Sequence, residues 1–231
     1  MIVLIGVGHV FAISERVMQE IFSVKPEVVC VELDPSRAEA LLSKNEKKGG
    51  DRALPLIYQM LALFQRVIAR KFETEPGLEM LAAIQAAKEV NAKLEFIDID
   101  AVTIAERIWR EMSFVERTKL VAMLFFGMFM STKKVEKSIE EFIDSEGEII
   151  EEFGKQFPTL KKILIEDRNN YMAWRIAMAA REYTNIVCVV GEGHIEGLSR
   201  KLSARNIPHR IVSLKQLLAE TNAEFTWSWV W

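Results

Sequence analysis

Five short apolar runs, separated by segments with helical spacing, constrain the fold of this chain more than any other feature. The runs are rich in Val and Ile and several are bounded by Gly, Pro or Asp, so we expect strands at 2–5, 28–33, 94–99, 186–190 and 210–214. Val17, Ile21 and Val24 lie at helical spacing between the first two runs, which predicts a β-α-β unit whose strands are parallel neighbours with a right-handed crossover. The pattern predicts an α/β fold with a central, mainly parallel sheet of about five or more short strands.

The middle of the chain has a different pattern, in which helical periodicity dominates and one strand interrupts it. We expect helices at 54–71, 76–92, 101–112, 115–130 and 133–142. No segment has the composition of a linker between domains. The sequence therefore predicts a single α/β domain over residues 1–231, with a mostly helical elaboration at about 50–185.

Composition and charge exclude several classes of protein. The formal net charge is −3 and the basic residues do not cluster, so we expect no nucleic-acid partner. Cys30 and Cys188 lie inside apolar runs, where a thiol behaves as a small buried hydrophobe, and no secretory signal is recognised, so we expect a cytoplasmic protein. The most apolar run, 120–130, is shorter than the roughly 20 residues that span a bilayer, so we expect no transmembrane span.

A strand followed by a Gly-x-Gly-His turn occurs twice. Aligning "IVLIGVGHV" with "IVCVVGEGHI" pairs Gly6, Gly8 and His9 with Gly191, Gly193 and His194. Because the carboxyl ends of parallel strands meet at one edge of a sheet, where ligands bind, we expect both imidazoles at one site. The third histidine, His209, has no such context, and we expect it to be structural.

The second strand supplies a carboxylate for the same edge, because "VVCVELDPSR" ends in acidic residues. Asp34 before Pro35 suits a helix N-cap, which leaves Glu32 as the third member of a His/His/carboxylate set typical of a catalytic divalent-metal site. Arg37 falls in the first helical turn, where a positive charge is unfavourable, so it is a candidate for binding a substrate carboxylate or an oxyanion. Glu192 is a candidate general base or further carboxylate ligand.

A nucleotide site is the rival interpretation, because glycines after a first strand and an acid after a second also occur in Rossmann folds. Both segments lack the third glycine at the required spacing; in "GEGHIEG", Gly197 is one position late. A nucleotide site also does not explain why His follows the glycines twice.

With these residues identified, the sequence resembles the TraB/PrgY family, relatives of the Tiki and GumN-like proteins. The matching segments, spread over most of the chain, are "GVGHVFAISERV", "PEVVCVELDPSR", "EDRNNYMAWRI" and "VVGEGHIEGL". The resemblance implies a metal-dependent hydrolase-like fold, with peptidase activity in the Tiki branch and pheromone shutdown in the PrgY branch. It marks His9, Glu32, Arg37 and His194 as site residues and adds Arg168; Asp167 stands where the family pattern has Glu.

The preferred functional prediction is a metal-dependent hydrolase that cleaves or inactivates a peptide or amide substrate. His9, Glu32 and His194 would hold a divalent ion, which could be Zn, Mn, Fe or Co. The alternative is a protein that binds a peptide or small ligand with the same residues and has no catalytic activity. The apolar run 120–130 and the Trp-rich segment 225–231 favour a homo-oligomer. Many relatives carry C-terminal membrane spans, so membrane association through such a region is a further expectation.

Overall fold

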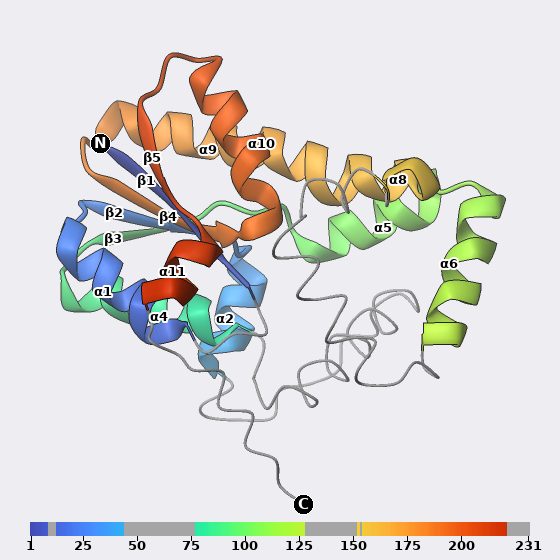
Figure 1. Ribbon diagram of the computed structural model, residues 1–231, viewed down its shortest axis with the longest axis horizontal. Helices are drawn as coiled ribbons and strands as arrows, with labels where there is room; N and C mark the ends of the chain where they lie inside the picture. The colour runs from blue at the N-terminus through green and yellow to red at the C-terminus, as the bar shows by residue number, and fades with distance from the viewer. Residues whose placement is uncertain (9–12, 44–76, 128–151, 153, 221–231) are drawn as a thin grey trace, which may run out of the picture.

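The computed structural model describes residues 1–8, 13–43, 77–127, 152 and 154–220 (Figure 1). Five parallel strands form one sheet in the order β3-β2-β4-β1-β5. They are β1 (Ile2–Val7), β2 (Val28–Val31), β3 (Lys93–Phe96), β4 (Ile186–Gly191) and β5 (His209–Val212). The predicted α/β fold and all five predicted strands are confirmed, with bounds that differ by a few residues.

The lateral order of the strands differs from the prediction. β4 lies between β1 and β2, so the first two strands are parallel but are not neighbours, and β1 likewise separates β4 from β5. The two six-residue strands β1 and β4 are apolar on both faces and almost wholly buried, so they occupy the middle of the sheet. β3 and β5 carry more exposed residues and form the edges. Helical spacing between two strands predicts that they run parallel, but it does not encode their order.

Helices cover both faces of the sheet (Figure 1). One face packs against α1 (Ser14–Val24), α2 (Pro35–Ser43), α4 (Leu78–Glu89) and α11 (Leu214–Glu220). The other face packs against α9 (Arg168–Glu182) and α10 (Glu192–Ser203). Alternate strand residues point to alternate faces, so Cys30 and Cys188 lie on the α9–α10 side, fully buried as predicted.

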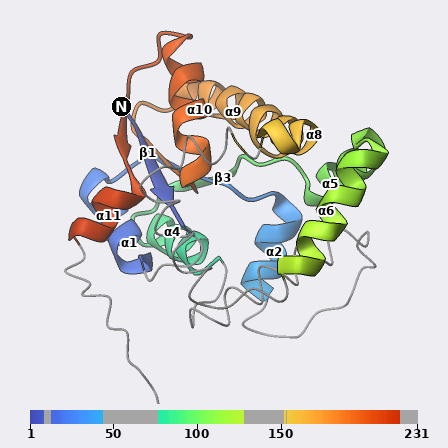
Figure 2. The same cartoon turned by 45° about the vertical axis from the view of Figure 1, so that its right-hand side comes forward.

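A second, smaller core lies beside the sheet, in a helical arm formed by α5, α6, α8 and η1 (Figure 2). These elements are α5 (Ala101–Glu111), α6 (Phe114–Gly127), α8 (Pro158–Lys161) and the π-helical segment η1 (Lys162–Asp167), which runs directly into α9. Glu116 in α6 accepts hydrogen bonds from the Thr159 N–H at 2.9 Å and hydroxyl at 2.9 Å, and this links α6 to α8. The helices predicted at 54–71 and 133–142 lie outside the described residues.

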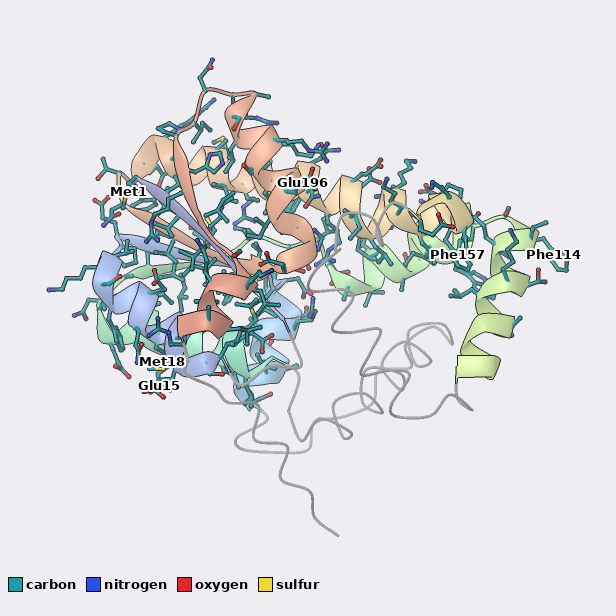
Figure 3. All side chains as sticks on the ribbon, viewed as in Figure 1. Met1, Glu15, Met18, Phe114, Phe157 and Glu196 are labelled. Carbon is teal, nitrogen blue, oxygen red and sulfur yellow. The ribbon has the colours of Figure 1, made fainter. Side chains whose placement is uncertain are left out.

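Large apolar side chains also lie on the surface of the arm and of α9. Phe114 and Phe157 are both labelled in Figure 3; Phe114 is exposed at the start of α6, whereas Phe157 is buried in the arm's core. Trp174 lies on the outer face of α9 and is half exposed. Within the described part of the chain, no helix combines the length and apolar character needed to cross a bilayer.

Candidate functional site

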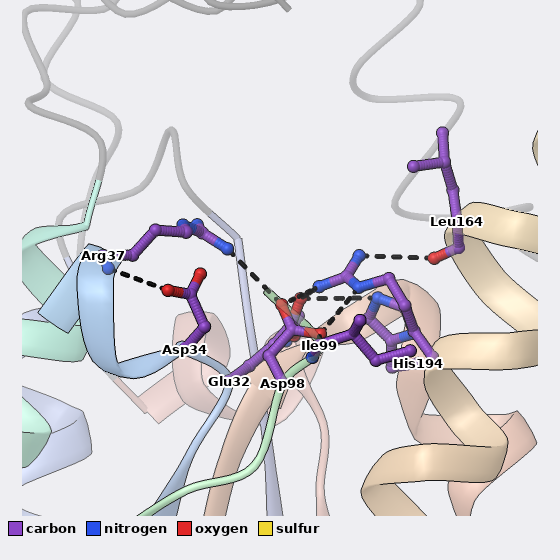
Figure 4. Close-up of polar contacts among 9 residues, drawn as sticks. Glu32, Asp34, Arg37, Asp98, Ile99, Leu164 and His194 are labelled. Carbon is purple, nitrogen blue, oxygen red and sulfur yellow. Dashed lines mark hydrogen bonds and ion pairs between the residues drawn. The ribbon is translucent and has the colours of Figure 1, made fainter. Parts of the chain in front are cut away.

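Charged and polar side chains meet where β2, β3 and β4 end (Figure 4). Glu32 directly follows β2, Asp98 lies two residues beyond β3, and His194 is the third residue of α10, which follows β4 without a loop. All three are buried, with 4–6% of their surface exposed. The carboxyl edge of the sheet therefore carries a buried polar cluster, in the place where α/β proteins bind ligands.

Arg168, the first residue of α9, joins the carboxylates of this cluster. Its Nε and Nη2 donate to Oδ1 and Oδ2 of Asp98 at 2.9 and 2.8 Å, and Nη2 also donates to Oε1 of Glu32. The remaining nitrogen, Nη1, donates to the Leu164 carbonyl at 3.3 Å. Burial alone would lower the pKa of Arg168, but the carboxylates of Glu32 and Asp98 outweigh burial, and the net pKa lies above its usual value. The guanidinium is therefore always charged.

The helix changes its winding just before Arg168. The wider turns of η1 span Lys162–Asp167 and end where α9 begins. Such π-helical segments within α-helices often occur at functional sites. Asp167, immediately before Arg168, pairs with Arg107 of α5 at 2.6 Å and does not contact the cluster in the described contacts.

Glu32 is bound on both of its oxygens. Oε2 accepts from the backbone N–H of Gly191 at 2.6 Å, at the N-terminus of α10, and Oε1 lies 3.4 Å from Nε2 of His194. Burial alone would raise the pKa of the Glu32 carboxyl, but the facing His194 and Arg168 and the Gly191 N–H hold its pKa well below the usual value. Glu32 is therefore an ionised carboxylate in a buried position.

His194 is held from its other side by Asn169, the residue after Arg168. Nδ1 of His194 lies 2.8 Å from Oδ1 of Asn169, and both side chains are buried. Two consecutive residues of α9 therefore contact the two members of the Glu32–His194 pair.

Arg37 lies on the opposite side of Asp98, in the first turn of α2. Its Nη1 is 3.4 Å from Oδ2 of Asp98, and 46% of its side chain is exposed. Asp34 accepts from the backbone N–H of Arg37 at 3.0 Å, which confirms the predicted N-cap. Of the two arginines that contact Asp98, Arg37 has the side chain that is more exposed to solvent.

Glu192 points toward β1 and α11. Its Oε2 accepts from the backbone N–H of Leu214 at 2.8 Å. A Cβ atom on Gly6 would lie 1.7 Å from that oxygen, so the absence of a side chain at Gly6 admits the carboxylate. Burial raises the pKa of Glu192, and the Leu214 N–H offsets this only in part.

The strands that precede the two repeated turns are neighbours, with Gly6 opposite Val190 and Val7 opposite Gly191. His9 itself lies outside the described residues. Among the residues that are described, no three or more His, Cys, Asp or Glu side chains form a cluster suited to a metal ion. The sheet thus brings Glu32, Arg37, Arg168 and His194 to one edge, and the ligand role of His9 remains a prediction.

Sequence reasoning missed two members of the cluster, Asp98 and Asn169. The predicted strand 94–99 was too long at its carboxyl end: β3 stops at Phe96, so Asp98 follows a strand just as Glu32 does. An acidic residue after the third strand was the available signal for Asp98. Asn169 had no comparable signal beyond its position next to Arg168.

The sequence is similar to known proteins along most of its length. A family model described as the TraB/PrgY/gumN family matches residues 1–207. An uncharacterised protein of Methanocaldococcus jannaschii is 31% identical over 210 residues, which cover 87% of this chain and 53% of the relative. The chain therefore spans about half the length of that relative. Because the family model matches nearly the whole length described here, the chain belongs to the TraB/PrgY/gumN family.

Proposed function

We propose that this chain is a metal-dependent hydrolase that acts on a peptide or amide bond. The observation that supports this most directly is the buried pair of His194 Nε2 and Glu32 Oε1, 3.4 Å apart at the carboxyl edge of the sheet. Glu32 is ionised there, because His194, Arg168 and the Gly191 N–H lower the pKa of its carboxyl despite burial.

The spacing of this pair fits a metal ion. Two ligands of a tetrahedral ion with bonds of about 2.0–2.1 Å lie about 3.3 Å apart, close to the observed distance. Arg168 does not exclude such an ion, because a carboxylate oxygen has two lone pairs and Oε1 can accept one hydrogen bond and still bind a cation. His9, which follows the strand adjacent to β4, would be the third ligand.

A divalent ion held by these residues would supply a Lewis acid for a carbonyl oxygen and a water of lowered pKa. The chain's own residues would contribute fixed charge and orientation. Arg168 holds Glu32 and Asp98 in place, and Arg37, whose guanidinium is partly exposed, would bind substrate carboxylate or the negative charge that develops on the carbonyl oxygen. Glu192 remains a candidate general base by prediction, but its carboxylate is held by the Leu214 N–H and is not among the side chains of the cluster.

A second candidate is a binding protein without turnover, and one observation favours it. Glu32 already has Arg168 on one oxygen and Gly191 on the other, so its charge is balanced without a metal ion. In that case Arg37 would bind an anionic group of a peptide or small ligand. The buried cluster would have only a structural role, in which Asp98 positions Arg37.

Metal analysis and a hydrolysis assay on matched histidine variants would separate the two candidates. The hydrolase predicts stoichiometric metal and cleavage of a peptide panel with Mn, Co or Zn, both lost in His194→Ala. His209→Ala is the control, because His209 contacts Ser199 and the Ile207 carbonyl, away from the cluster. Peptide binding by wild type without metal and without cleavage would support the binding protein and reject the hydrolase.

A further inference from the structure

Asn169 and Gly197, which lie in family-matching segments but were not marked as site residues, fit together behind His194. Gly197 follows His194 by three residues on α10, so both lie on the same face of that helix. A Cβ atom on Gly197 would lie 2.2 Å from Nδ2 and 3.0 Å from Cγ of Asn169. Any side chain at position 197 would therefore displace the Asn169 amide.

A glycine within a helix lowers the stability of the helix, so its presence at position 197 calls for a structural reason. Gly in a helix interior is less favourable than Ala, and Gly197 lies in the middle of α10 (Glu192–Ser203). The glycine that sits one position late for a nucleotide-binding motif thus has a different use, because it gives the Asn169 amide room to reach the imidazole.

The contact between Asn169 and His194 fixes the position of a proton. A carboxamide oxygen can only accept, so Oδ1 at 2.8 Å from Nδ1 requires that Nδ1 carry the hydrogen. In the neutral ring, Nε2 then has a lone pair directed toward Oε1 of Glu32, 3.4 Å away. In that state two electron-rich atoms face each other, so a cation between them is favoured: either a second proton, which makes the imidazolium whose charge lowers the pKa of Glu32, or a metal ion.

We propose that Asn169 and Gly197 are positioning residues that hold His194 as the Nδ1–H tautomer, with Nε2 free to bind a cation. The purpose of the free Nε2 rests on the proposed metal-dependent function, whereas the tautomer itself does not. Asn169 selects the tautomer by accepting from Nδ1, and Gly197 acts through Asn169 by leaving space for it.

Histidine ¹⁵N NMR of the metal-free protein, at a pH well above the ordinary imidazole pKa, tests the tautomer directly. In wild type the His194 resonance is expected to show a protonated Nδ1 and an unprotonated Nε2. Asn169→Ala should reverse this, because Nε2–H can then donate to Glu32. Asn169→Asp keeps an acceptor at the same place and should retain the wild-type tautomer.

Gly197→Ala gives an independent test, since it leaves Asn169 in the chain. Its methyl group should displace the amide and reverse the tautomer, although Ala favours the helix. Glu196→Ala is the matched control: this neighbour on α10 is exposed and should leave the tautomer unchanged. Backbone amide spectra confirm that each variant is folded, and if Asn169→Ala does not fold, Gly197→Ala and Asn169→Asp decide the question.

A wild-type His194 protonated at Nε2, or a tautomer that Asn169→Ala and Gly197→Ala both leave unchanged, would overturn the inference. Titration with Zn²⁺ separates this result from the proposed function. If the tautomer is as expected but Zn²⁺ does not perturb Nε2, the metal-dependent function fails and the positioning role stands. If Zn²⁺ binds, Asn169→Ala should weaken its affinity about 10–100-fold, as loss of a residue behind a metal ligand typically does.

Discussion

Asp98 and Arg168 form a two-pronged contact, with Nε–Oδ1 and Nη2–Oδ2 distances of 2.9 and 2.8 Å, across 70 residues of sequence. The Asp98 side chain is almost fully buried and the Arg168 side chain is 15% exposed. Parallel hydrogen bonds of this kind fix both the position and the plane of a guanidinium. The contact therefore sets the direction of the second Nη2 hydrogen of Arg168, which is donated to Glu32.

We expect Asp98→Ala to destabilise the fold by roughly 3–5 kcal/mol, because removing one member of a buried ion pair leaves its partner uncompensated. Urea unfolding measures the change. Asp167→Ala is the matched control: Asp167 pairs with Arg107 in a more exposed position and should cost about 1 kcal/mol or less. An equal decrease in the free energy of unfolding of the two variants would contradict the burial of the Asp98 contact.

The link between α6 and α8 should depend on acid pH through Glu116. Burial works to raise the pKa of Glu116, but donors on Thr159 and Ser113 outweigh it and the net pKa is lowered. The folded pKa is then below the unfolded value of about 4.3, so the carboxylate stabilises the fold above that pH and the contribution is lost as pH falls through the folded pKa.

Glu116→Gln should accordingly lower the free energy of unfolding at neutral pH and flatten its loss in acid. Urea unfolding at a series of pH values measures this. Glu196→Gln, an exposed position on α10, is the control and should follow the wild-type curve. A Glu116→Gln curve parallel to that of wild type would mean that Glu116 does not supply the acid sensitivity.

Gly6 and Glu192 should be energetically coupled. A methyl group at position 6 would overlap Oε2 of Glu192, so we expect Gly6→Ala to displace that carboxylate from the Leu214 N–H and to cost about 1–3 kcal/mol. In a Glu192→Ala background the same change should cost clearly less. A double-mutant cycle of unfolding free energies measures the coupling, and strict additivity would show that the two residues do not compete for space.

Cys30 and Cys188 should react with thiol reagents only when the sheet opens. They are opposite each other on β2 and β4, and both are fully buried. Contact with Cys30 and burial raise the pKa of the Cys188 thiol, so its thiolate is scarce as well as inaccessible. Modification by Ellman's reagent should therefore accelerate with urea in parallel with unfolding. A fast phase in native buffer would contradict the placement of both thiols in the core.

Local pattern was sufficient for the strands and for part of the site. The central strands β1, β2 and β4 are continuous non-polar runs, and Glu32 and His194 are recognisable because each follows such a run. Their meeting could be expected as well, since parallel strands place their carboxyl ends at one edge. The predicted N-cap at Asp34 and the burial of both cysteines follow from equally local signals.

Other features depend on packing that no local pattern records. β4 lies between β1 and β2, where both of its edges are paired with another strand. Which strands are paired on both edges depends on the whole sheet and not on the sequence of any one strand. Asn169 is buried near the start of α9, directly after the π-helical segment η1, and no local pattern marks that winding.

The place of β4 also has a consequence for how the protein is made. β1 and β2 leave the ribosome early, yet the strand that must lie between them is synthesised more than 150 residues after β2, as the 159-residue separation of Glu32 and Gly191 shows. Until then each of these strands has an open edge that can recruit a wrong partner. The polar cluster can assemble only after β4 and α10 have been synthesised, so a nascent chain stalled before β4 would lack the cluster and be prone to aggregate.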